Sequence, residues 1–357
     1  MDTTRVLTAN ISQIKSLISI FPRTTSVLIA GQPGIGKSDL FEQIAKDWNA
    51  KYDRHETATW DAVDVKGCPF PIGHATEFLP PKALLELTDQ ADYKGPVVAN
   101  FDDIGAAEEA VFNALLGVFL QRYVGPYKIR ENVLLCGTTN RAEDRAGARE
   151  LTTALNNRFV HFNLSPEPEE WVQWAIRNDV DPNIIGYIRT RPDKLNTFDA
   201  KSPERAFATP RSVTQASKLQ IAVGLNHKDL ILAIASAVGP AWALEYKAWL
   251  DRTRSLVTAE EILKDPKNCR IPSEDEVDVN HATIASLVHA IAKDPSMKTI
   301  KAGFVYSVRL PHADMGAVLA SDVNRIFTNC QDSDVQAKIA QDKDFEHACN
   351  KFTEIMG

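Results

Sequence analysis

The sequence predicts an α/β protein whose parallel sheet is followed by an all-helical region. In the first part of the 357-residue chain, short apolar runs alternate with stretches of helical periodicity, which is typical of a parallel sheet. After about Pro166, proline and glycine separate one helical pattern from the next, and no convincing strand is found. At about 150 residues per domain, the length corresponds to roughly two or three domains.

Periodicity locates the main elements of this fold. Three apolar runs have the length of buried strands and lie at 26–30, 96–101 and 132–139. Helices are predicted where apolar residues recur three or four positions apart, as they do at 11–18, 39–50 and 108–122. Changes in pattern predict an α/β domain over 1–165, a helical domain over 166–265 and a helical extension over 266–357.

Composition excludes several classes of protein. Hydrophobic residues make up 44% of the chain and charged residues 24%, so neither a disordered chain nor a collagen is expected. The net charge of −7 disfavours a nucleic-acid-binding role. The five cysteines form no CxxC pair, which argues against a zinc ribbon and fits a reducing compartment. Without a signal peptide pattern or a membrane-spanning apolar run, we expect a cytoplasmic protein with no membrane partner.

The strongest motif is a glycine-rich loop between the first predicted strand and the helix that follows it. Its residues match G-x-x-x-x-G-K-[ST] at every fixed position and are Gly31, Gln32, Pro33, Gly34, Ile35, Gly36, Lys37 and Ser38, with Asp39 opening the helix. Glycines let backbone N–H groups approach phosphates, and the helix N-terminus adds positive charge. We therefore expect Lys37 to reach the β- and γ-phosphates of a nucleotide and Ser38 to hold Mg²⁺.

Two acids stand where the second predicted strand ends. A phosphate-binding loop needs one acid to hold the metal and a base to position water. Asp102 is assigned to the Mg²⁺ shell, and Asp103 is assigned to the attacking water. The alternative is a pair of solvated acids at a strand end. Many P-loop ATPases carry glutamate at the second position, so the shorter Asp103 predicts slower turnover.

Three further polar residues complete the predicted site. Asn140 ends the third strand and is expected to orient the attacking water, although asparagine also commonly forms turns at such positions. Arg158 follows a predicted helix, and Arg211 begins a helix in the all-helical part. A guanidinium group forks onto phosphate oxygens and stays ionised, which suits either arginine to the γ-phosphate. The alternative for each is a surface ion pair.

In this order, the motifs resemble those of a known family. GQPGIGKS, VVANFDDI, LLCGTTN, LNNRF and TPRS are similar to Walker A, Walker B, sensor 1, the arginine finger and sensor 2 of AAA+ ATPases. TEFLPPKALLELTDQ and the stretch around Arg211 resemble bacterial and phage-encoded MoxR-like ATPases. The resemblance covers about residues 5 to 265. It implies an AAA+ domain followed by a helical lid, with Arg158 acting in trans on a neighbouring subunit and Arg211 acting in cis.

The resemblance also implies a function. It implies a homo-hexameric ring that binds ATP and Mg²⁺ between subunits, hydrolyses ATP, and remodels or activates a protein client. In this family the partner commonly carries a von Willebrand factor A-type domain. A nucleic-acid motor or loader and an ATP-gated assembly module with slow turnover remain as alternatives. The segment 68–87 is either a pore-facing insertion or a loop packed on the core.

Overall fold

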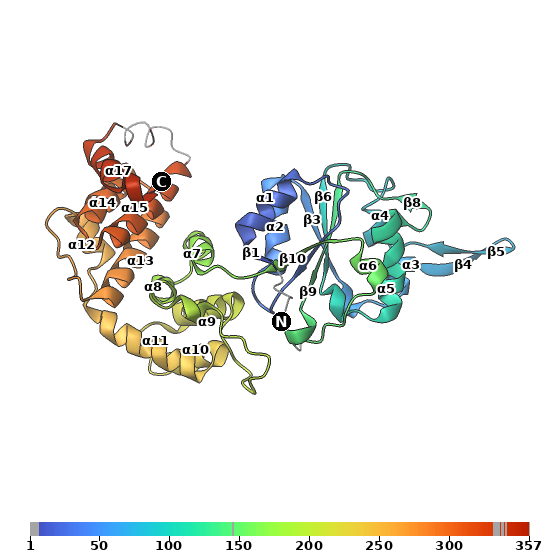
Figure 1. Ribbon diagram of the computed structural model, residues 1–357, viewed down its shortest axis with the longest axis horizontal. Coiled ribbons are helices and arrows are strands. Elements are labelled where there is room, and N and C mark those ends of the chain that lie inside the picture. The colour runs from blue at the N-terminus through green and yellow to red at the C-terminus, as the bar shows by residue number, and fades with distance from the viewer. Residues whose placement is uncertain (1–6, 145, 331–335, 337–338, 340, 357) are drawn as a thin grey trace, which may run out of the picture. The chain divides into compact units, whose positions relative to one another are not determined.

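The structure is a computed structural model that describes residues 7–144, 146–330, 336, 339 and 341–356. It divides into two compact units. The first contains the chain up to residue 167 together with 198–202, and the second contains 168–197 and the chain from 203 onward. Figure 1 labels their elements. The predicted separation of a lid over 166–265 from an extension over 266–357 stays a prediction.

Among the described residues, six parallel strands form the sheet of the first unit. They are β1 (Thr8–Ala9), β2 (Val27–Ala30), β3 (Lys51–Glu56), β6 (Val97–Asp102), β9 (Val133–Thr139) and β10 (Val160–Leu164). Their order across the sheet is β1-β10-β2-β9-β6-β3. The three strands predicted from apolar runs, β2, β9 and β6, are neighbours within it. The predicted α/β class, a parallel sheet followed by a helical region, is confirmed.

Helices cover both faces of this sheet, so its central strands are apolar on both sides. Val27 and Ile29 of β2 pack with α1 (Ile11–Ile20) and α2 (Lys37–Asp47). Leu28, between them, belongs to the cluster that contains the apolar side chains of α5 (Glu109–Leu116). Figure 1 shows α1 and α2 on one side of the sheet and α5 on the other. Burial on both faces explains why these strands appear in the sequence as continuous apolar runs.

Three strands of the sheet were not predicted. Strand β1 has only two residues, too few to carry a pattern, and β3 and β10 were missed for different reasons. The edge strand β3 has the sequence KYDRHE, and within it only the His55 side chain is buried. An edge strand packs against one neighbour, so it needs fewer apolar residues. Strand β10 lies between β1 and β2, yet its first two residues are exposed. Neither strand therefore carries an apolar run of the kind that marks β2, β6 and β9.

A separate hairpin projects from the first unit (Figure 1). Its antiparallel strands are β4 (Cys68–Ile72) and β5 (Ala75–Leu79), and every residue of both is exposed. The following short helix α4 (Lys82–Leu85) instead buries Leu84. The sequence left two interpretations of the segment 68–87, a pore-facing insertion and a loop packed on the core. The second does not describe the hairpin, because its residues are exposed.

The register of the hairpin fixes which backbone groups of β4 face outward. Ile72 pairs with Ala75 across a two-residue turn, so this pair exchanges ladder hydrogen bonds and the next pair, Pro71 with Thr76, does not. Pro69, two residues earlier, occupies the equivalent position. The nitrogen atoms of both prolines therefore lie on the outer edge of β4, where proline removes no bond from the ladder.

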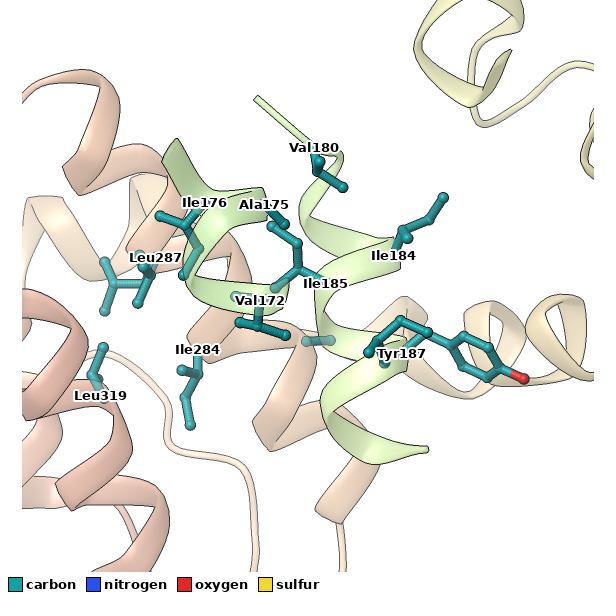
Figure 2. Packing of buried hydrophobic residues seen from close by; sticks show 14 of the residues in the cluster. Val172, Ala175, Ile176, Val180, Ile184, Ile185, Tyr187, Ile284, Leu287 and Leu319 are labelled. Atoms are coloured by element: carbon teal, nitrogen blue, oxygen red, sulfur yellow. The ribbon is translucent and has the colours of Figure 1, made fainter. Parts of the chain in front are cut away.

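The described part of the second unit is helical, and its buried apolar side chains form one core. Its helices are α7 (Pro168–Arg177), α8 (Pro182–Thr190), α9 (Pro210–Val223), α10 (Leu230–Val238), α11 (Pro240–Arg252), α12 (Ala259–Lys264), α13 (Val277–Lys293), α14 (Met297–Arg309), α15 (Ala313–Thr328) and α17 (Lys343–Met356). The core extends from Trp171 to Phe352. Figure 2 shows Val172 of α7, Ile185 of α8 and Ile284 of α13 within it. Among the described residues, no helix is both long and apolar enough to cross a membrane.

A buried ion pair joins α8 to α15 in this unit. Arg189 Nη1 lies 2.7 Å from Asp322 Oδ2, and the two side chains are 4% and 2% exposed. Arg189 also donates a hydrogen bond to Glu169, and Asp322 accepts one from Gln173. Burial lowers the pKa of Arg189, but the charges of Asp322 and Glu169 outweigh burial and raise this pKa above its ordinary value. Arg189 therefore stays charged inside the unit.

Replacing Asp322 with alanine should lower the free energy of unfolding by about 3–5 kcal/mol, because Arg189 would keep a buried charge without its main partner. Urea unfolding followed by circular dichroism measures this loss. The control is Asp251→Ala, which removes an exposed partner 2.9 Å from Lys247 and should leave the unfolding midpoint nearly unchanged. Equal midpoints for Asp322→Ala and the unmodified protein would show that the buried pair does not stabilise the unit.

Candidate nucleotide-binding site

The glycine-rich loop connects β2 to α2 and takes a path that depends on two of its glycines. Gly36 caps the N-terminus of α2 with φ 93°, a left-handed value that side chains with a Cβ disfavour. At Gly31 the obstacle is space, because a Cβ would lie 2.7 Å from Ile35 Cδ1 and 3.0 Å from the Leu164 carbonyl oxygen. The loop can therefore pass close to its neighbours and still open into the helix.

Lys37 is the first residue of α2, and its side chain lies over this loop. The residue is only 7% exposed. Its Nζ atom donates hydrogen bonds to the carbonyl oxygens of Gly31 at 3.0 Å and Gln32 at 2.9 Å, and to Asn140 Oδ1 at 2.8 Å. The ammonium group thus stands beside a helix N-terminus, and the two together suit phosphate groups. It also connects the loop to the end of β9.

Asp102, the last residue of β6, is a buried and fully partnered carboxylate. Oδ1 accepts a hydrogen bond from Ser38 Oγ at 2.7 Å and another from Thr138 Oγ1. Oδ2 lies 2.7 Å from Arg54 Nη2. Burial raises the pKa of Asp102, but the hydrogen bonds from Ser38 and Thr138 and the charge of Arg54 outweigh burial, so this pKa is below its ordinary value. The group is ionised at neutral pH.

These residues fit a nucleotide with Mg²⁺. The Ser38 hydroxyl and the Asp102 carboxylate are hard oxygen donors, the kind that Mg²⁺ prefers, and they are in hydrogen-bond contact. Both are next to the N-terminus of α2, whose backbone N–H groups and Lys37 supply positive charge for phosphates. The donor set and the loop therefore match both parts of the predicted ligand.

Asp103 follows β6 in a left-handed backbone conformation, with φ 50° and ψ 41°. Such values are uncommon for residues other than glycine and often occur where a functional side chain must be directed. Its N–H group donates to Thr138 Oγ1 at 3.1 Å, and its Oδ1 accepts from Asn140 Nδ2 at 3.4 Å. The second acid and the strand-end asparagine are therefore adjacent, as their predicted roles require.

The two predicted arginines stand in different units. Arg158 is exposed and follows α6 (Thr153–Asn156) in the first unit, where it lines an open surface pocket of about 500 Å³. Arg211 belongs to the second unit and is the second residue of α9. It lies in the first turn, where Thr209 and Ser212 form a capping box. A cation in the first turn opposes the helix dipole, so Arg211 is not placed there for helix stability. The roles of both arginines stay predictions.

Three residues of the site were not identified from the sequence. Arg54 pairs with Asp102 from β3, Thr138 donates to the same carboxylate from β9, and Thr57 Oγ1 donates to the Asp102 carbonyl oxygen at 2.7 Å. Thr138 could have been identified from the sequence, because side chains alternate along a strand and Thr138 therefore lies on the same side as the predicted site residue Asn140. Nothing in the sequence pointed to Arg54, because the strand that carries it, β3, was not predicted.

Comparison with known proteins finds similarity only at the level of solved structures. No protein-family model matches the chain, and no curated protein is similar to it in sequence. The RuvB Holliday-junction branch-migration motor of Thermotoga maritima is 17% identical, with 72% of this chain and 75% of that chain covered and a TM-score of 0.38. A point mutant of that motor is 18% identical, with 72% of each chain covered and a TM-score of 0.38.

A candidate ATPase from Cytophaga hutchinsonii is 14% identical, with 93% of this chain and 80% of that chain covered and a TM-score of 0.35. Similarities this weak support no statement about activity, substrate or partner. The fold follows from the chain itself, because a parallel six-stranded sheet within the described residues carries the glycine-rich loop between β2 and α2 and Asp102 at the end of β6. The chain therefore has the α/β fold of P-loop nucleoside triphosphatases, followed by a helical region.

Proposed function

We propose that this protein is a Mg²⁺-dependent ATPase of the AAA+ type. The observation that supports this most strongly is the convergence of the ends of β2, β6 and β9 on one linked set of side chains. Lys37 bonds to Asn140 at 2.8 Å, and Ser38 bonds to Asp102 at 2.7 Å. Phosphate binding, metal binding and positioning of water are thereby served by neighbouring groups.

Each residue has a definite role in this proposal. Lys37 binds the β- and γ-phosphates, and Ser38 and Asp102 hold Mg²⁺, which supplies charge neutralisation at the phosphates when bound. Asp103 accepts a proton from the attacking water, and Asn140 orients both the water and Asp103. Arg158 of a neighbouring subunit stabilises the charge that develops on the γ-phosphate, and Arg211 senses the nucleotide of its own chain.

The wider proposal is a homo-hexameric ring of MoxR type that remodels a protein client, one candidate client being a protein with a von Willebrand factor A-type domain. The order of the five motifs supports the ring. The exposed hairpin of β4 and β5 supports a protein client, because the segment 68–79 contains apolar residues, one glutamate and no lysine or arginine. A surface of this composition does not attract a phosphate backbone.

Phosphate release from ATP, measured with and without Mg²⁺ and with and without DNA, tests these proposals. We expect hydrolysis that requires Mg²⁺ and does not change when DNA is added. Strong stimulation by DNA would replace protein remodelling with a nucleic-acid motor. Light scattering tests the remaining alternative, an ATP-gated assembly module with slow turnover, which the short side chain of Asp103 favours. Ring formation that depends on nucleotide but occurs without hydrolysis would support that alternative.

Asp103→Asn should bind ATP normally but lose hydrolysis by about 10²- to 10⁴-fold, because the amide keeps the shape of the side chain and cannot accept the proton. Single-turnover hydrolysis and equilibrium ATP binding, measured on the same preparation, separate the two effects. Asp103→Glu is the companion variant and should be as fast or faster if side-chain length limits the rate. Normal turnover in Asp103→Asn would assign the base to another acid, such as Glu108.

A further inference from the structure

Arg54 lies between two acids of very different exposure. Its Nη2 atom is 2.7 Å from Asp102 Oδ2 and 3.2 Å from Glu56 Oε1. The Asp102 side chain is 7% exposed, Glu56 is 62% exposed, and Arg54 itself is 48% exposed. One guanidinium group therefore connects the candidate metal site to a carboxylate in solvent.

Strand register explains how one side chain reaches both acids. In the parallel pair β3 and β6, Arg54 is opposite Asn100, and Glu56 is opposite Asp102. Residues 54 and 56 lie on the same side of β3, because side chains alternate along a strand. Arg54 is thus diagonal to Asp102 and two positions from Glu56. Because Nη2 already contacts both acids, rotation of the half-exposed side chain can release Asp102 and keep Glu56, with no movement of the backbone.

We infer that Arg54 is a positioning residue that competes with Mg²⁺ for Asp102, and that it leaves Asp102 and keeps only Glu56 when the metal binds. This inference rests on the proposed nucleotide site. Ser38 and Thr138 already occupy Oδ1 of Asp102, and Arg54 pairs with Oδ2. A divalent cation held at Ser38 and Asp102 would repel the guanidinium group, which has Glu56 as its other partner.

The arrangement has a functional consequence. While Arg54 neutralises Asp102, the buried carboxylate is stable without metal, since it keeps a partner for its charge. Metal binding must displace this partner, so the contact raises the Mg²⁺ concentration at which the site fills. Glu56 has the opposite effect, because it stabilises Arg54 in the displaced position. Arg54 and Glu56 together thus set the Mg²⁺ requirement of nucleotide binding.

The test measures metal binding directly and does not depend on hydrolysis. Protein saturated with a fluorescent ADP analogue is titrated with Mg²⁺ at constant ionic strength, and Mn²⁺ binding to the same complex is followed by electron paramagnetic resonance. Arg54→Gln should lower the midpoint metal concentration by roughly three- to tenfold, as expected for a partly exposed ion pair that opposes binding. Arg54→Lys, which keeps the charge, should stay closer to the unmodified protein.

The second arm tests the exchange of partners. Glu56→Gln should raise the midpoint about two- to threefold, because Arg54 loses its alternative partner. In the Arg54→Gln background the same change should have no further effect. Lys46→Gln is the charge control, since Lys46 pairs with Glu42 on the exposed side of α2 and its side chain is 74% exposed. Its midpoint should not shift.

Three outcomes would overturn the inference. The first is an unchanged or raised midpoint in Arg54→Gln with nucleotide still bound. The second is weaker nucleotide binding without a midpoint shift, which would make Arg54 a phosphate ligand. The third is an undiminished Glu56→Gln effect in the absence of Arg54. Failure of the unmodified protein to bind any nucleotide is a different result and would reject the proposed function itself.

Discussion

Lys37→Ala should lose tight ATP binding, with Kd rising by about 10²-fold or more. The ammonium group faces the β- and γ-phosphates in the proposed complex, and charged hydrogen bonds of this kind contribute about 1.5–3 kcal/mol each. Equilibrium binding of labelled ATP measures the change. Lys46→Ala, on the same helix but exposed, is the matched control and should bind ATP normally.

Lys37 also bonds to Asn140, so loss of the charge must be separated from loss of this link between the loop and β9. Asn140→Ala removes the link and keeps the charge. We expect it to bind ATP nearly as well as the unmodified protein and to hydrolyse it more slowly. Unchanged ATP affinity in Lys37→Ala would refute the assignment of the phosphate-binding loop.

Arg158→Ala should lose turnover by about 10³- to 10⁵-fold, the range measured for arginine fingers in related phosphoryl transfer, while each subunit still binds ATP. The size of the effect reflects charge that appears only in the transition state. Mixing this variant with the Lys37→Ala, Asp103→Asn double variant should restore part of the activity. The double variant can lend its intact Arg158 to a neighbour whose own Lys37 and Asp103 are sound.

Arg211→Ala should behave differently in the same assay. Because Arg211 is proposed to act on the nucleotide of its own chain, this variant should lose affinity as well as turnover, and mixing should not rescue it. Rescue of Arg211→Ala but not of Arg158→Ala would reverse the two roles. Absence of rescue in both mixtures, in rings shown to have exchanged subunits, would count against an active site shared between neighbours.

Much of the fold and part of the site could be predicted because their signals are local. Burial on both faces made β2, β6 and β9 apolar runs, and the carboxyl ends of adjacent parallel strands meet at one edge of a sheet. Lys37 follows β2 in sequence, and Asp102 is the last residue of β6. The contact between Asp102 and Ser38, the neighbour of Lys37, was therefore predictable from the positions of the strand ends alone.

The remainder depends on contacts between segments that carry no local signal. Arg54 meets Asp102 through the register of β3 on β6, and β3 is a polar edge strand without an apolar run. The left-handed backbone of Asp103 likewise belongs to the turn after β6, and an aspartate at a strand end does not by itself predict it. Arg158 and Arg211 act, in our proposal, through assembly and lid position, which no single segment encodes.

The proline positions in the hairpin have a consequence for how the protein behaves in concentrated solution. Exposed apolar hairpins tend to pair with one another through the hydrogen-bonding edges of their strands. A growing polymer of such hairpins needs both outer edges of every hairpin to form these hydrogen bonds. Pro69 and Pro71 remove donors from the outer edge of β4, so only the β5 edge can accept another strand with its full set of bonds. Two hairpins can therefore pair through their β5 edges, but a third cannot add to them. Polymer growth from this surface is blocked, and the apolar side chains of the hairpin stay accessible.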